Sequence, residues 1–207
     1  MQNLEKPTFE KQRNVHSAEE FGLMTHAIMT CIASAFQGGV TEEDSREHMR
    51  GDLVLVHVDD NGKKVNSFGA YKFGSPNEIF NRSDFSDERG IYISAVTVHQ
   101  EAQGRGLYKA MNEEGLSEAV EQRYPLVFTR TQNPRVQAGV QSILHGFVQE
   151  KKIAGYTLEQ RLLPGFYGQM LTKEQQFARS VTFDELDARA GDAYVLIFHL
   201  DYATEEA

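Results

Sequence analysis

The chain has 207 residues, 40% of them hydrophobic and 25% charged, which is enough for one globular domain with a full core. Its formal net charge of −9, with basic residues scattered along the sequence, argues against nucleic-acid and anionic-membrane partners. A single cysteine, and no apolar segment long enough for a signal-peptide core or a bilayer span, predict a cytoplasmic protein.

The first fifty residues predict an arm and two helices. Residues 1–15 are polar and predict an N-terminal arm, and a single domain is expected over residues 16–207. Ser17 and Glu20 form a capping-box pattern, which opens a helix whose apolar residues recur at helical spacing as far as Phe36. A second, acidic helix is predicted from Thr41 to about Arg50.

A β-hairpin and a central strand follow. Residues 53–58 and 65–73 are apolar, and the turn sequence Asp59-Asp60-Asn61-Gly62 between them predicts a hairpin. Residues 75–90 are polar and predict a long loop. Residues 91–98 are rich in Ile, Val and Tyr, which favours a central strand.

The second half of the chain alternates helices and strands. The predicted elements are a helix from Gly104 to about Gln122, a strand at 125–130, a helix from Pro134 to His145, and strands at 153–163 and 193–200. An atypical insertion at 164–192 carries two short helices that begin at Thr172 and Thr182. Because the strands alternate with helices after an initial hairpin, the sequence predicts an α/β fold with a mixed sheet flanked by helices.

The stretch Val96 to Met111, VTVHQEAQGRGLYKAM, joins the central strand to its helix through Gly104, Arg105 and Gly106. A helix begins with unpaired amides and the positive end of its dipole, and glycine leaves those amides open to a phosphate oxygen. Arg105 and Lys109 add positive charge beside them. The Walker and dinucleotide-binding patterns do not fit, because Leu107 and Tyr108 follow the glycines and Lys109 stands where a small residue is needed.

This stretch is similar to motif A of the GNAT acetyltransferase superfamily, whose pattern is Gln/Arg-x-x-Gly-x-Gly/Ala. Gln103 and Gly106 match the first two positions, whereas Tyr108 departs from the small third residue. The resemblance extends in element order over roughly residues 17–163, including a helix that ends near Gly146-Phe147.

The resemblance implies a GNAT-like acyl-CoA N-acyltransferase fold, acetyl-CoA as acyl donor, no metal, and a small-molecule or peptide amine as acceptor. It implies that the strands at 91–98 and 125–130 splay apart around the pantetheine arm of the coenzyme. The residues that would bind the coenzyme are Val96, Val98, Gln103, Gly104, Arg105, Gly106, Leu107, Tyr108 and Asn133. Val96 and Val98 would pair with the arm through their backbone, and the amide of Val98 would hold the oxyanion.

No catalytic acid or base follows from the resemblance. The family's tyrosine acid falls on Ser142 or Val140, depending on the end from which the helix is counted. The candidates for a base that activates the amine are His57, Tyr71, Glu78, Glu88 and Tyr92.

Structural and functional alternatives stay open. The glycines could form a tight turn and no more, Asn133 could serve only as a helix cap, and Cys31 could be a buried apolar group. The chain could also be an acyl-CoA sensor without turnover, or a scaffold with no coenzyme. A homodimer is compatible with the sequence, with 164–192 as a candidate contact or acceptor-side segment.

Overall fold

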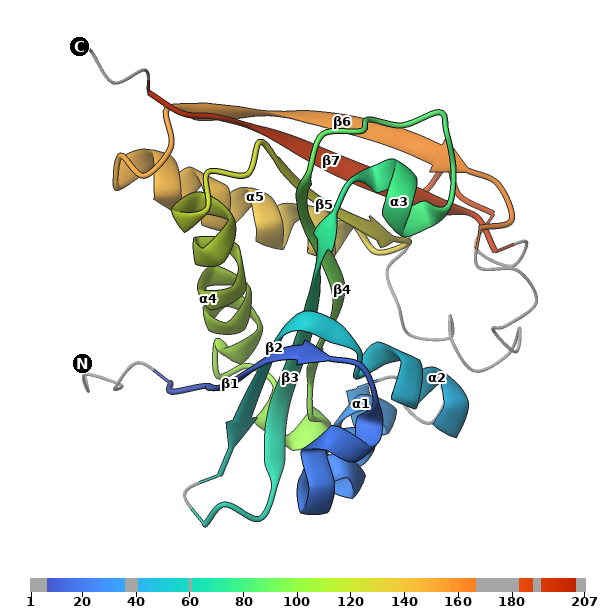
Figure 1. Cartoon of the computed structure of the whole chain (residues 1–207), viewed down its shortest axis with the longest axis vertical. Coiled ribbons are helices and arrows are strands. Elements are labelled where there is room, and N and C mark those ends of the chain that lie inside the picture. Colours follow the sequence, from blue (N-terminus) through green and yellow to red (C-terminus); the bar gives the residue numbers. More distant parts are fainter. Residues whose placement is uncertain (1–6, 36–40, 60, 167–182, 188–190, 204–207) are drawn as a thin grey trace. The chain divides into compact units, whose positions relative to one another are not determined.

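The computed structural model describes residues 7–35, 41–59, 61–166, 183–187 and 191–203 (Figure 1). Its strands are β1 (Glu10–Val15), β2 (Gly51–Val58), β3 (Val65–Gly74), β4 (Gly90–Val98), β5 (Leu126–Thr131), β6 (Gly155–Leu163) and β7 (Ala193–Asp201). Its helices are η1 (Ala18–Met24), α1 (Thr25–Ala35), α2 (Glu42–His48), α3 (Pro76–Phe80), η2 (Gln100–Ala102), α4 (Leu107–Glu121) and α5 (Pro134–Gln149), where η marks a 3₁₀ helix. No helix in the described part of the chain is both long and apolar enough to cross a membrane.

The strands form one seven-stranded sheet in the order β1-β2-β3-β4-β5-β7-β6. β4 and β5 pair in parallel, from Gly90 opposite Leu126 to Ile93 opposite Thr129. The pairs β1–β2, β2–β3, β5–β7 and β6–β7 are antiparallel. The predicted α/β fold with a mixed sheet flanked by helices is therefore confirmed.

The chain divides into two compact units, one of Met1–Tyr71 with Ser94–Gly115 and the other of Lys72–Ile93 with Leu116–Ala207. In the first unit, one core cluster joins α1 to the β2–β3 hairpin and includes Ile28, Cys31, Ile32, Val54, Val56, Phe68 and Ala70. The alternate residues of β3 face α4, where the Tyr71 hydroxyl donates to the Met111 carbonyl at 3.0 Å. Because both faces of the hairpin are covered, β2 is an unbroken apolar run from Leu53 to Val56.

In the second unit, β5, β7 and β6 also carry packed side chains on both faces. One face holds an apolar cluster formed by Tyr92, Leu126, Phe128, Leu163, Val195 and Ile197, with Phe80 packed against it. On the other face of β6, the Tyr156 hydroxyl donates to the Gln141 carbonyl of α5 at 3.4 Å. Helix α5 turns a buried stripe inward at helical spacing, made of Val140, Ile143, Leu144 and Phe147.

The predicted N-terminal arm is wrong for its last six residues, which form β1. This strand pairs with β2 from Glu10 opposite Val56 to Val15 opposite Gly51. Its sequence, EKQRNV, shows no apolar alternation, because Val15 is the one residue of the strand that is buried. An edge strand of this kind leaves no hydrophobic period in the sequence.

Three further boundaries differ from the prediction. The first helix is interrupted at Gly22, whose φ of 54° and ψ of −121° kink the chain within η1, and α1 begins only at Thr25. The predicted loop at 75–90 contains α3, which Ser75 caps by accepting from the Glu78 amide at 3.2 Å. Helix α5 continues through Gly146 because Phe147 extends its buried stripe. The helix predicted at Thr172, the predicted cap Thr182 and the predicted stop at Gly38-Gly39 lie outside the described residues, whereas residues 183–187, which follow Thr182, form a turn and not the predicted helix.

Candidate functional site

The turn between β4 and α4 lies within the first unit and is closed by local hydrogen bonds. His99 caps η2, since its Nδ1 accepts from the Glu101 amide at 3.3 Å. Gln103 follows η2 in an extended conformation, and its Nε2 donates to the Val98 carbonyl at 3.3 Å. The side chain of the first motif residue therefore ties the turn back to the end of the strand.

Gly104 and Gly106 both have positive φ, of 78° and 77°. A side chain in this region costs roughly 1–2 kcal/mol, so the backbone path itself calls for glycine. A Cβ built at either position would meet nothing within 4 Å. The space beside these two residues is open, as a phosphate cradle requires.

The start of α4 offers free backbone donors next to this space. The Ala110 amide donates to the Gly106 carbonyl at 3.0 Å and begins the hydrogen-bonding of the helix. The amides of Leu107, Tyr108 and Lys109 precede it and have no carbonyl one turn earlier to bond to. Arg105 is exposed, and its Nη2 donates to the Glu101 carbonyl at 3.3 Å, which keeps this cation beside the turn.

The turn rests on a small apolar cluster of Val98, Ala102 and Leu107, which are 8%, 1% and 6% exposed. The side chain of Leu107 is thus a packing residue, and only its backbone is available to a ligand. The half-buried ring of Tyr108 packs against the same cluster, which explains how the turn accommodates a residue larger than motif A prescribes. Burial raises the pKa of the Tyr108 hydroxyl to about 12, with the nearby Asn112 side chain acting in the opposite direction.

The backbone of β4 presents hydrogen-bonding groups on the edge opposite β3. The His99 amide donates to the Asn66 carbonyl of β3 at 2.8 Å. Because successive amides of an extended strand point to opposite edges, the amide of Val98 points away from β3. The backbone groups of Val96, two residues earlier, share that direction. These are the groups that the sequence predicts to pair with an extended ligand.

Asn133 lies in the second unit and caps α5, because its side chain accepts from the Arg135 amide at 2.9 Å. The helix-cap interpretation is therefore confirmed for its Oδ1, while its contact with a coenzyme stays a prediction. Val140 and Ser142 are the two positions where the resemblance would place the family's catalytic tyrosine. Val140 is buried and Ser142 is exposed. Neither side chain supplies a proton donor comparable to tyrosine.

The structure gives three of the five candidate bases another role. Tyr71 is fully buried, and burial raises its pKa well above the usual value, so its hydroxyl stays protonated. Glu78 completes the cap of α3 by accepting from the Ser75 amide at 2.9 Å. Tyr92 is 4% exposed among the rings of Phe80 and Phe128, and burial raises its pKa as well. His57 is half-buried and Glu88 is exposed.

One residue of the site region escaped the sequence analysis. Asn112 is completely buried, its Nδ2 donates to the Tyr108 carbonyl at 2.9 Å, and its Oδ1 has no hydrogen-bond partner among the residues that the structure describes. The only signal was its four-residue spacing from Tyr108, which is too common on a helix to single it out. Within the described ranges, no group of three or more His, Cys, Asp or Glu side chains is arranged to hold a metal ion.

The sheet order and its flanking helices define the class: the chain has the GNAT acyl-CoA N-acyltransferase fold, and GNAT-family acetyltransferases are among the solved structures that it resembles. Naa20 of Chaetomium thermophilum, in complex with a bisubstrate analogue, is similar with a TM-score of 0.51 and 17% identity, over 97% of this chain and 93% of that chain. An IAA acetyltransferase from Bacillus cereus is similar with a TM-score of 0.50 and 12% identity, over 93% of this chain and 99% of that chain. No protein-family model and no curated protein matches the sequence. The likeness at these identities is one of fold, and it confirms the fold that motif A implies.

Proposed function

We propose that the protein is an N-acetyltransferase that moves the acetyl group of acetyl-CoA to a primary amine. The observation that carries this proposal is the open turn at Gly104 and Gly106, which follows β4 in a chain with the GNAT fold. Open space, unpaired helix amides and an exposed arginine together favour a diphosphate group at this place.

The geometry of the turn supports a division of the coenzyme-binding roles. The amides of Gly104 to Tyr108 hold the pyrophosphate, and Arg105 adds an exposed positive charge. The Gln103 amide, which the sequence also predicts to bind, already donates to the Gln100 carbonyl at 3.3 Å. The backbone groups of Val96 and Val98, on the edge of β4 away from β3, pair with the pantetheine arm. The Oδ1 of Asn133 is used in the cap of α5, and a coenzyme contact of this residue stays a prediction from the resemblance.

The reaction is a direct transfer. The amine nitrogen attacks the thioester carbonyl, the new C–N bond forms, the C–S bond breaks, and CoA leaves as the thiolate. The amide of Val98 stabilises the oxyanion that develops on the carbonyl, a contribution on the order of 3 kcal/mol when well aimed. The amine gives up its proton to a base or an ordered water. No acid is required if the thiolate departs as an anion.

A second function has one specific observation in its favour. Neither Val140 nor Ser142 can replace the tyrosine that protonates the leaving thiolate in many family members. A domain that binds acyl-CoA without turnover, as a sensor or a subunit, fits this absence.

Thiol release with acetyl-CoA and a panel of small-molecule and peptide amines tests the proposal. We expect release that depends on the amine and saturates with acetyl-CoA. Stabilisation by CoA with no thiol release for any amine would instead support the sensor. Failure of millimolar acetyl-CoA to raise the melting temperature would leave only a scaffold.

A further inference from the structure

Strand β6 forms one edge of the sheet. It pairs with β7 along all nine of its residues, from Gly155 opposite Asp201 to Leu163 opposite Ala193. In the described part of the chain no strand pairs with its other edge. A long edge strand with free amides and carbonyls is a template for another strand.

The hydrogen bonds of β7 establish which residues of β6 point their backbone outward. The Leu200 amide donates to the Pro125 carbonyl at 2.7 Å, on the β5 side of β7. The amide of His199 therefore points to β6, where His199 lies opposite Thr157. Thr157, Glu159 and Arg161 accordingly bond to β7, whereas Leu158, Gln160 and Leu162 direct their amides and carbonyls to the open edge.

The two edge strands of the sheet are protected very differently. β1 has six residues, three of them charged, and its Asn14 has a φ of 54°, which distorts the strand. These are the usual devices that keep an edge from pairing. β6, with the sequence GYTLEQRLL, contains neither proline nor lysine and has no residue with positive φ. Its backbone is therefore ready to accept a partner strand.

We propose that β6 pairs in antiparallel orientation with the β6 of a second copy of this chain, about a two-fold axis at Gln160. In this register Gln160 faces Gln160 of the second copy, Leu158 faces Leu162, and Glu159 faces Arg161. Gln160, Leu158 and Leu162 are the residues whose backbone groups point outward, so they form the hydrogen-bonded pairs. Glu159 and Arg161 then occupy the closer, non-hydrogen-bonded pairs, where side chains interact most strongly.

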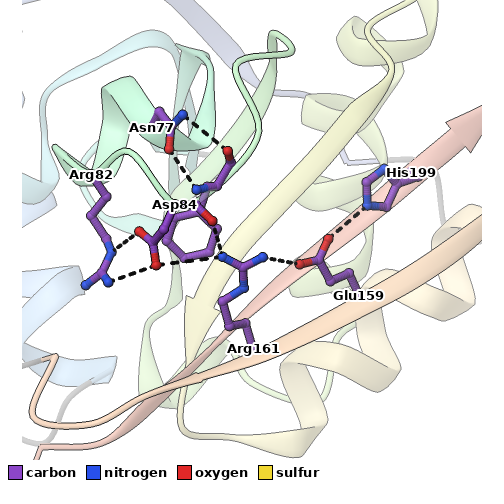
Figure 2. A network of polar contacts seen from close by, with 7 residues as sticks. Asn77, Arg82, Asp84, Glu159, Arg161 and His199 are labelled. Carbon is purple, nitrogen blue, oxygen red and sulfur yellow. Dashed lines mark hydrogen bonds and ion pairs between the residues drawn. The ribbon is translucent and has the colours of Figure 1, made fainter.

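The charges of β6 are complementary to themselves in this register. Glu159 and Arg161 project from the same face of the strand, and the Arg161 Nη2 lies 2.8 Å from the Glu159 Oε1 (Figure 2). The two-fold axis brings each carboxylate opposite the arginine of the other copy and makes a group of four alternating charges. Shifting the register by two residues would place either the two glutamates or the two arginines opposite each other, which is unfavourable.

The opposite face of β6 is complementary through apolar contact. Among the described residues, Leu23 and Leu162 are the large hydrophobic side chains left exposed, and Leu162 is 40% exposed. The proposed register covers Leu162 with Leu158 of the second copy. Cross-strand apolar pairs of this kind stabilise a sheet.

The charged side chains are held in place before any second copy arrives. The Arg161 guanidinium lies over the Phe85 ring at 4.4 Å and contacts Asp84, and the His199 Nε2 lies 3.3 Å from the Glu159 Oε2 (Figure 2). Asp84 is itself bound by Arg82, at 2.7 Å and 3.0 Å. Because these side chains are already ordered, pairing costs less conformational entropy than it would for free surface residues.

Charge-reversal variants of Glu159 and Arg161 test this interface. Size-exclusion chromatography with light scattering measures the mass of each variant in solution, and so shows whether it is a monomer or a dimer. The wild-type chain is expected to be a dimer. Glu159→Arg and Arg161→Glu each place like charges opposite each other at two symmetric positions, and each is expected to weaken dimerisation by roughly tenfold or more. Mixing the two variants restores opposite charges at both positions, so the mixture is expected to form a heterodimer. A monomeric wild type, single variants that dimerise as tightly as the wild type, or a mixture that stays monomeric would overturn the proposal.

A disulfide test does not depend on electrostatics. Cys31, the one native cysteine, is buried, so Gln160→Cys adds the only exposed thiol in the protein. Facing Cα atoms in a hydrogen-bonded pair are about 5.5 Å apart, which a disulfide can bridge. Mild oxidation is expected to yield a covalent dimer. Thr157→Cys is the matched control, because the register separates the two copies of Thr157 widely. Equal cross-linking of both variants, or of neither, would contradict the register.

Discussion

Arg105 is flanked by two glycines and is exposed, so its side chain can contribute to ligand binding without a structural role in the core. Arg105→Gln is expected to weaken acetyl-CoA affinity by roughly threefold at low ionic strength, because one exposed charge contributes little more. The loss should shrink as salt is added, since salt screens exposed charges. Arg50→Gln removes another exposed arginine, which follows α2, and should leave the affinity unchanged. A loss independent of salt would contradict a charge effect.

Cys31 is expected to make stability depend on pH in the alkaline range. Burial raises the pKa of its thiol from 9.0 to about 11, although the Thr97 hydroxyl lies 3.9 Å from the sulfur. The folded state thus binds the proton more tightly than the unfolded state. This stabilisation is complete below pH 9 and is lost as the pH rises from about 9 through 11, by roughly 1 kcal/mol at pH 10.

Chemical denaturation of the wild type and Cys31→Ala from pH 8 to 10 measures this contribution. The alanine variant is less stable at pH 8 because it lacks the buried sulfur. Its disadvantage should narrow toward pH 10, since only the wild type loses the thiol contribution. Parallel curves for the two proteins would show that Cys31 does not titrate as its burial predicts.

Helix α4 packs against β3 through a glycine that tolerates no side chain. A Cβ at Gly115 would lie 2.2 Å from the Cζ of Tyr71, whose ring is buried and whose hydroxyl is bonded to Met111. Gly115→Ala is expected to lower the free energy of unfolding by about 1–3 kcal/mol. Denaturant titration checks this value.

Gly146 of α5 provides the matched control. It lies inside a helix, and a Cβ there would meet nothing within 4 Å. Gly146→Ala should therefore raise the free energy of unfolding by about 0.5–1 kcal/mol, because alanine favours the helix. Equal effects of the two substitutions would contradict the packing described for α4.

Longer elements with end signals were predictable from the sequence, whereas the shortest helices were missed even where they carry a cap. Thr41 and Asn133 carry caps that the structure confirms, with bonds from the amides of Asp44 and Arg135. α3 was missed because its five residues are too few to show a helical period. Gly146 suggested a helix end, but the continuing apolar stripe at Phe147 outweighed it.

At the scale of the whole molecule, the order of elements predicted the fold, because hairpin, central strand, helix, strand and helix allow few arrangements of one mixed sheet. The open turn of the candidate site was predictable because Val96 to Tyr108 are contiguous in sequence, while coenzyme binding at this turn stays a prediction. A catalytic acid or base was not, because such a group depends on residues distant in sequence, and burial removed Tyr71 from the candidates only once the packing was known.

The most direct test of the account is a calorimetric titration of acetyl-CoA into the wild type, Gly106→Val and Gly62→Val. Gly62 matches Gly106, since its φ is 66° and a Cβ there would also meet nothing within 4 Å, but it lies in the β2–β3 turn. Both substitutions impose similar backbone strain, and circular dichroism verifies that both variants are folded. We expect binding to the wild type and to Gly62→Val with similar affinity, and binding at least about tenfold weaker for Gly106→Val, whose side chain occupies the space beside the helix amides. Undiminished affinity in a folded Gly106→Val variant would contradict coenzyme binding at this turn.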